Sequence, residues 1–239
     1  PASPDPLMGN YEGRWTAGME VDPEMSAQVI PLGEDLYRII LAPKLHMRYP
    51  ALLTVEVTAE NGKLRFDEEN YFGETDGHTF TGGEKRGPET FSMKKIALDP
   101  PTLGAKPPAG AVVLFDGGNL DAWEPVKGWK VLDDGTLMVT PDGDDLLSKQ
   151  HYKDVQLHIE FRLPYMPAAR GQERGNSGVF VQDVYEVQVL DSFGLAGNNN
   201  ECGAMYKVSP PQVNACGPPL EWQTYDITFR AARFDAEGK

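Results

Sequence analysis

The stretch Val155-Gln-Leu-His-Ile-Glu-Phe-Arg-Leu163 indicates the fold class most clearly. Apolar residues occupy every second position in it, and Gln, His, Glu and Arg stand between them. Because successive side chains of a strand point to opposite faces, this alternation predicts an antiparallel strand with one buried face and one solvated face. Shorter patterns of the same kind predict strands at Leu146–Ser148, Gly178–Gln182, Tyr185–Leu190 and Tyr225–Arg230.

The first hundred residues also have the composition of strands. Short apolar runs that predict strands lie at Gln28–Pro31, Leu36–Leu41, Leu52–Thr58 and Lys63–Asp67. Asn61-Gly62 separates the last two, and both residue types tolerate the positive φ of a tight hairpin turn. Residues 1–98 are therefore predicted to form a small antiparallel β-meander domain. The Pro- and Gly-rich residues 99–111 read as a linker, and residues 112–239 as a second β domain.

The composition excludes several classes of protein. The 239 residues carry a net charge of −14 at pH 7, and the 25 Gly and 20 Pro leave little room for long helices. An acidic chain has no basic face for a phosphate backbone or an anionic membrane surface, so we expect no nucleic acid binding. No run approaches the roughly 18 apolar residues that a membrane-spanning helix needs, so we expect no membrane insertion. Because the sequence begins at Pro1 without a Met, we expect a processed or trimmed product.

The two cysteines, Cys202 and Cys216, are too few for a disulfide scaffold and too far apart for a CxxC motif. They form either two buried thiols or, in an oxidising compartment, one disulfide, which would stabilise the fold by about 3 kcal/mol. We predict the disulfide. With the missing Met, it favours an extracytoplasmic location, in the bacterial periplasm or at the cell surface.

The segment Tyr185–Ser192 carries the clearest chemical signal. On a strand, Glu186 and Gln188 share one face, where a carboxylate beside an amide suits acid–base work on a sugar. Asp191 falls on the opposite face and joins them only if a bulge intervenes. The alternative interpretation is an ordinary solvated strand face.

The loop Arg170–Gly178 precedes this segment and is rich in polar residues and glycine. It could present Arg174, Asn176 and Ser177 as hydrogen-bond donors to sugar hydroxyls or to an enolate oxygen, and it is equally typical of an exposed turn. The four scattered histidines show no zinc-binding spacing, and no nucleotide-binding motif is present.

Several motifs together resemble the 3-keto-disaccharide hydrolase domain family of bacteria, over about Val112 to Lys239. They are Leu114-Phe-Asp-Gly117 with Leu120 and Trp123, Leu147-Ser-Lys149, Leu157-His-Ile-Glu-Phe-Arg162, Asn176-Ser-Gly-Val-Phe180, Tyr185–Ser192, Cys202-Gly-Ala-Met-Tyr206 and Glu221-Trp-Gln-Thr-Tyr225. The linker is similar to that of planctomycete-type members, which carry a small β domain in front.

The resemblance implies a concanavalin-like jelly-roll sandwich, related in shape to laminarinase-type glucanases. Gln188 stands where those enzymes have a carboxylate, which fits a different chemistry better than two flanking carboxylates do. The implied reaction acts on 3-keto-disaccharides or other 3-keto-glycosides. A base removes the C2 proton beside the ketone, the group at C1 leaves, and water adds back.

The resemblance also implies roles for individual residues. Glu186 is base or acid with Asp191 as its partner, and Gln188 and Asn176 orient the substrate. The enolate donors would be Lys149 and Arg174. The stacking rings would be Tyr206 and Trp222, although a core role suits Trp222 equally. The chemistry admits a divalent metal at the ketone, and the sequence offers no clear ligand set for one.

Two other functions remain open: a non-catalytic glycan-binding module and a structural or assembly protein of a bacterial surface. A jelly roll of this kind would continue beyond Phe234–Lys239. We therefore expect further strands from a tail, a fragment, a homo-oligomer or a partner chain, because an open sheet edge promotes aggregation.

Overall fold

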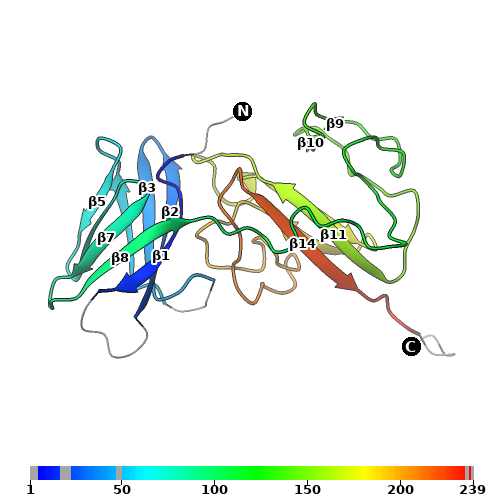
Figure 1. The fold of residues 1–239 in the computed structure, drawn as a ribbon. Coiled ribbons are helices and arrows are strands. Elements are labelled where there is room, and N and C mark those ends of the chain that lie inside the picture. Colours follow the sequence, from blue (N-terminus) through cyan, green and yellow to red (C-terminus); the bar gives the residue numbers. More distant parts are fainter. Residues whose placement is uncertain (1–4, 17–22, 47–49, 235–236, 238–239) are drawn as a thin grey trace. The chain divides into compact units, whose positions relative to one another are not determined.

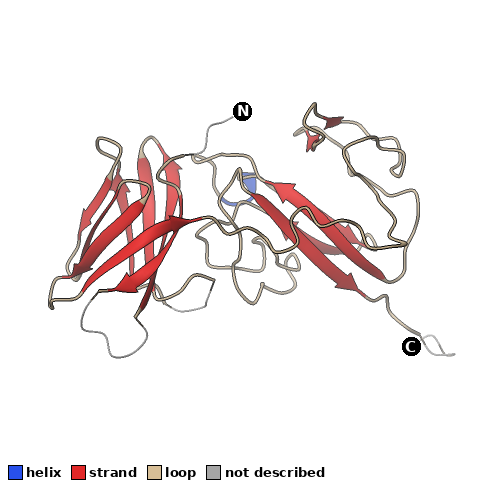
Figure 2. Cartoon of the chain, in the orientation of Figure 1, coloured by secondary structure: helices blue, strands red, loops and turns tan. Residues whose placement is uncertain are grey.

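The computed structural model of the protein describes residues 5–16, 23–46, 50–234 and 237. The regular structure of these residues is β throughout, apart from one 3-10 turn at Gly171–Glu173, which is blue in Figure 2. The prediction of an all-β protein is confirmed.

Eight of the strands form one antiparallel sheet. They are β1 (Gly9–Trp15), β2 (Glu24–Gly33), β3 (Leu36–Ala42), β4 (Leu53–Thr58), β5 (Leu64–Asp67), β6 (Tyr71–Thr75), β7 (Thr79–Glu84) and β8 (Thr90–Ile96), in blue to green in Figure 1. Their order is β4-β3-β2-β1-β8-β7-β6-β5, which is two four-stranded meanders joined by the pairing of β1 with β8.

The predicted Asn61-Gly62 turn closes this sheet. Both residues have positive φ, and Glu60 pairs with Lys63 across the turn. The turn thus connects β4 and β5, which stand at the two ends of the strand order, so the sheet curls back on itself.

Aromatic side chains fill the interior of the curled sheet. Tyr11 and Phe80 are fully buried and pack edge to face, with ring centroids 5.6 Å apart. Trp15 packs in the same way on Phe91, as a core residue. Glycine makes room for these rings, because a Cβ at Gly73 would lie 2.7 Å from the Phe66 ring.

The remaining strands form three two-stranded sheets. They pair β9 (Trp129–Val131) with β10 (Leu137–Val139), β11 (Val155–Arg162) with β14 (Trp222–Phe229), and β12 (Ser177–Val181) with β13 (Tyr185–Val189). Paired strands without helices are consistent with a jelly-roll sandwich.

The prediction of a strand at Leu146–Ser148 is wrong, since Ser148 makes only an isolated bridge with Trp123. The partner segment runs into Pro125, which has no N–H to extend a ladder.

Packing divides the chain into two units, residues 1–103 with 159–225, and residues 104–158 with 226–239. The domain division predicted at residues 98 and 111 rests on the linker composition and stays a prediction.

Within the first unit, the loop after β11 and the segment after β13 pack against the curled sheet. Phe193 lies in an apolar cluster with Met8, Ile30 and Leu32. The Arg170 guanidinium donates a 2.8 Å hydrogen bond to the Leu32 carbonyl. The curled sheet therefore supports both segments that flank the candidate site.

The Asp5 carboxylate adds a polar connection in the same unit. Its Oδ2 accepts hydrogen bonds from the hydroxyls of Tyr37 in β3 and Tyr165 in the loop after β11, each at 2.8 Å. Burial is the main cause that raises the pKa of both phenols, and the Asp5 carboxylate adds to it. Both hydroxyls therefore stay protonated donors at neutral pH.

Candidate functional site

The candidate site is centred on β13. Gln188 is only 1% exposed although it is polar, so its side-chain amide needs partners. One end of this amide lies 3.1 Å from Glu186 Oε1 and 3.2 Å from the Ser177 carbonyl, and the other end lies 3.0 Å from both Asn176 Oδ1 and Gln172 Oε1. Glu186, Gln188, Asn176 and the Ser177 backbone therefore lie together.

The glycine opposite Gln188, Gly178, leaves room for the Glu186 carboxylate. Gly178 pairs with Gln188 in the β12–β13 register. A Cβ at Gly178 would lie 2.2 Å from Glu186 Oε1, so the Glu186 side chain extends across β12 where a side chain is missing. Any larger residue at position 178 would displace this carboxylate.

Hydrogen bonds hold β13 on both edges. One edge pairs with β12. On the other edge, Gly203 N donates to Gln188 O, Gln188 N to Ala204 O and Tyr206 N to Glu186 O, each at 2.9 Å. The backbone beneath Glu186 and Gln188 is therefore fixed on either side.

The structure joins Asp191 and Arg174 to one another. Asp191 is 1% exposed, and its Oδ2 accepts a 2.6 Å hydrogen bond from Arg174 Nε, while its Oδ1 accepts from Phe193 N at 3.3 Å. Burial raises the pKa of the Asp191 carboxyl, and the Arg174 guanidinium opposes this shift. Two predicted site residues thus form one buried ion pair.

The predicted Cys202–Cys216 disulfide is not formed in this structure, where both residues are free, buried thiols. They lie in an apolar cluster with Leu163 and Val189, in which a thiol packs as a small hydrophobic group. A hydrogen bond with the Cys216 thiol is the main cause that lowers the pKa of Cys202 to about 7.

Tyr225 connects these thiols to the site strand. Cys202 Sγ lies 3.1 Å from the Tyr225 hydroxyl, which donates a 2.5 Å hydrogen bond to the Gln188 carbonyl. Burial is the main cause that raises the pKa of Tyr225, so its hydroxyl remains a donor.

The two predicted stacking rings each carry a cation on one face. The Arg162 guanidinium carbon lies 5.0 Å from the centroid of Trp222, and Lys207 Nζ lies 4.9 Å from that of Tyr206. Tyr206 is next to Glu186 through its backbone, whereas Trp222 begins β14.

Lys149 belongs to the second unit, where its Nζ donates to the Asp121 carbonyl at 2.9 Å. Within the described ranges, no three His, Cys, Asp or Glu side chains come together as a metal-binding group. The described residues also include no helix of the length and hydrophobicity needed to span a membrane.

Sequence reasoning missed Gln172 and Phe180. Gln172 lies in the 3-10 turn and contacts the Gln188 amide, and Phe180 lies opposite Glu186. The register of the hairpin would have identified Phe180. That register depends on a three-residue loop in which Gln182 and Asp183 adopt positive φ without any glycine to signal it.

A carboxylate beside buried amides on a strand face, in an all-β protein, defines a class of site suited to acid–base chemistry on a hydroxylated ligand. The profile of the 3-keto-alpha-glucoside-1,2-lyase-like domain family matches residues 110–236, more than half of the chain. The chain belongs to this family.

One similar solved structure is that of a "putative glycosyl hydrolase" from Parabacteroides distasonis ATCC 8503. It is 43% identical, and the match covers 54% of this chain and 57% of that chain, with a TM-score of 0.49. This chain therefore spans less than two thirds of the solved one. No curated protein matches the chain.

Proposed function

We propose that the protein cleaves the glycosidic bond of 3-keto-glycosides by elimination followed by hydration. The observation that carries this proposal is the Glu186 carboxylate beside the buried Gln188 amide, in a chain whose family is lyase-like. An amide cannot serve as nucleophile or general acid, so the pair supplies one titratable group and one orienting group.

One titratable group suits the proposed reaction. The 3-ketone acidifies the C2–H bond, so Glu186 removes that proton and the electron pair forms an enolate. The enolate then expels the oxygen substituent at C1, so that the C1–O bond breaks and a C1=C2 double bond forms. The departing oxygen takes up a proton. Water adds across that bond to give the free 3-keto sugar, so all atoms balance.

The other residues support the acid–base group. The Gln188 amide contacts Asn176 and Gln172 at one end and Glu186 at the other, so these side chains hold the carboxylate in place. We assign Asp191 and Arg174 a positioning role, because they bond to each other and hold the loop 170–176 against the segment after β13. Ordered partners of this kind keep a catalytic group in its productive geometry.

The test is the release of keto sugar from 3-keto-trehalose or 3-keto-sucrose. We expect turnover by the unmodified protein and a loss of roughly 100-fold or more in Glu186→Gln, since positioned acid–base groups typically contribute that much. Glu68→Gln, an exposed carboxylate after β5, is the matched control and should leave turnover unchanged.

Equal rates in Glu186→Gln and the unmodified protein would show that the site assignment is wrong. If the unmodified protein binds the sugar without turnover, the glycan-binding module is the better description. Filaments or ordered oligomers without saccharide affinity would favour the assembly function.

A further inference from the structure

An exposed aromatic ring lies beside the candidate acid–base residue. Phe180 is directly opposite Glu186 in the antiparallel register of β12 and β13. Opposite residues in such a pair project on the same face, with Cβ atoms roughly 5 Å apart. Phe180 is nevertheless 54% exposed, although the other face of β12 packs into the core.

A second aromatic residue stands on the other side of Glu186. Tyr206 N donates to Glu186 O, and the neighbouring residues Met205 and Val187 form an antiparallel bridge. This register places Tyr206 next to Glu186 on the same face. The carboxylate is therefore flanked by one aromatic residue on each side.

Only one end of this face is open. Gln188 and Ala204 are buried at the closed end, whereas Phe180 is exposed and Glu186 and Tyr206 are half-buried. A ligand that reaches the Glu186 carboxylate must therefore lie over the aromatic end of the face.

The two aromatic residues differ in what already covers them. Lys207 Nζ lies over the ring of Tyr206, at 4.9 Å from its centroid. The Phe180 ring is more exposed than the Tyr206 ring and, unlike it, carries no polar group. A ring of this kind suits the C–H face of a pyranose, whose hydroxyls then point sideways to polar groups such as the Glu186 carboxylate.

We propose that Phe180 is the platform on which a pyranose ring of the substrate stacks, and that it thereby determines which glycosides bind productively at Glu186. This inference rests on the proposed function, because it concerns the ligand of the same carboxylate. Stacking holds the ring flat on the strand face, and so sets which of its C–H bonds faces Glu186.

The first experiment measures binding alone. Calorimetric titration of 3-keto-trehalose into Glu186→Gln gives the reference affinity without turnover. Adding Phe180→Ala should weaken binding about tenfold, the usual scale for truncating an aromatic anchor. Phe180→Trp should retain the affinity, and Phe72→Ala, which removes another exposed Phe from β6, should leave it unchanged.

The second experiment separates stacking from a structural role. In the active protein, Phe180→Ala should raise KM for 3-keto-trehalose about tenfold with a smaller change in kcat, while the thermal midpoint stays near that of the parent. Equal affinity of Glu186→Gln with and without Phe180→Ala would overturn the inference, and so would absence of binding by Glu186→Gln. Saccharide binding that depends on Phe180 without any turnover would support the inference and refute the proposed enzyme.

Discussion

The curled sheet β1–β8 and the unit formed by residues 104–158 and 226–239 use their apolar residues in opposite ways. In the sheet, thirteen residues form one buried cluster around Tyr11, Phe80 and Phe91. In the other unit, all described residues are exposed or half-buried, and Leu147, Val112 and Met138 are each more than 40% exposed.

The difference separates two sources of stability. Burial removes apolar area from water at roughly 25 cal/mol per Å², so the sheet has a stabilising core of its own. The second unit relies on turns and local hydrogen bonds, such as the 2.7 Å bond from Trp129 Nε1 to the Asp144 carbonyl. Substitutions should therefore have large effects in the sheet and small ones in the second unit.

The largest effect is expected from Phe80→Ala. Phe80 is fully buried and contacts the rings of Tyr11, Phe66 and Phe91. The lost transfer free energy and the cavity should lower the free energy of unfolding by about 3 to 5 kcal/mol, measured by urea denaturation. Phe72→Ala, at a residue 40% exposed, is the control and should cost far less. Equal losses would contradict the core assignment.

A smaller effect is expected from Trp129→Phe in the second unit. This change keeps an aromatic ring in β9 and removes the hydrogen bond to the Asp144 carbonyl, which should cost about 1 kcal/mol. Amide exchange in β9 and β10 measures it, and protection should fall there while β1–β8 stay unchanged. Loss of protection in the sheet as well would show that the two regions unfold as one.

Alternating apolar residues predicted β2, β3, β4 and β5 but missed β1 and β8, although Phe91 and Met93 face inward in β8. Ile39 and Leu41 face inward in β3, which was predicted, as β11 was. β6 and β7 were not, because Gly73 and Gly82 replace the inward apolar residues that would have revealed the alternation. The sequence could place Glu186 beside Gln188, but not pair Asp191 with Arg174, since that contact depends on tertiary folding of the loop 170–176.

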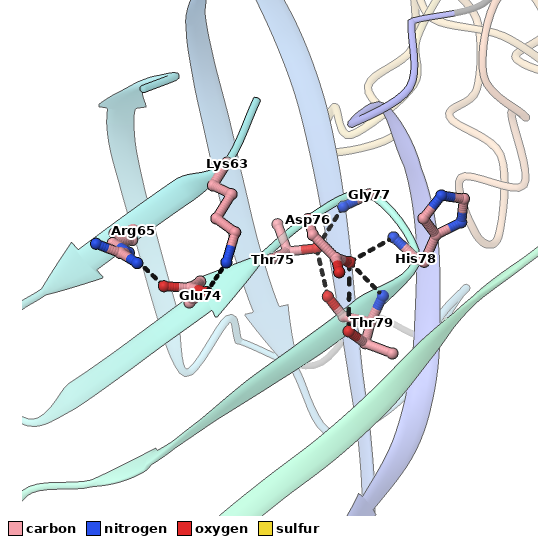
Figure 3. Close-up of polar contacts among 8 residues, drawn as sticks. All are labelled: Lys63, Arg65, Glu74, Thr75, Asp76, Gly77, His78 and Thr79. Carbon is pink, nitrogen blue, oxygen red and sulfur yellow. Dashed lines mark hydrogen bonds and ion pairs between the residues drawn. The ribbon is translucent and has the colours of Figure 1, made fainter. Parts of the chain in front are cut away.

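The stability of the curled sheet should depend on pH through the turn between β6 and β7. Asp76 Oδ1 accepts hydrogen bonds from the backbone N–H groups of His78 and Thr79, each at 2.9 Å (Figure 3). These bonds lower the pKa of Asp76 to about 2. Because the pKa of Asp76 is lower in the folded protein than in the unfolded chain, where it is about 4, the ionised carboxylate stabilises the fold above about pH 4. This contribution disappears as the pH falls through about 2.

Asp76→Ala tests this contribution. The variant should melt at a lower temperature than the parent at pH 7, and the difference in melting temperature should shrink between about pH 4 and pH 2. Glu74, which pairs with Lys63 and Arg65 in the same view, is left intact by this change. A difference that stays constant across this range would mean that the carboxylate charge has no part in the turn.

The smallest effect is expected from Leu147→Ser. Leu147 is 56% exposed, so the substitution removes little buried apolar area and should change the free energy of unfolding by less than about 0.5 kcal/mol. Urea denaturation measures this, and sedimentation at the same concentrations reports association. A loss above about 1.5 kcal/mol would indicate that the Leu147 side chain is buried in solution, because stability is lost in proportion to the apolar area removed from water. Such a loss, or a change in oligomeric state, would mean that a second copy or another chain covers Leu147. The contrast between the two regions would then describe the isolated chain and not the assembled protein.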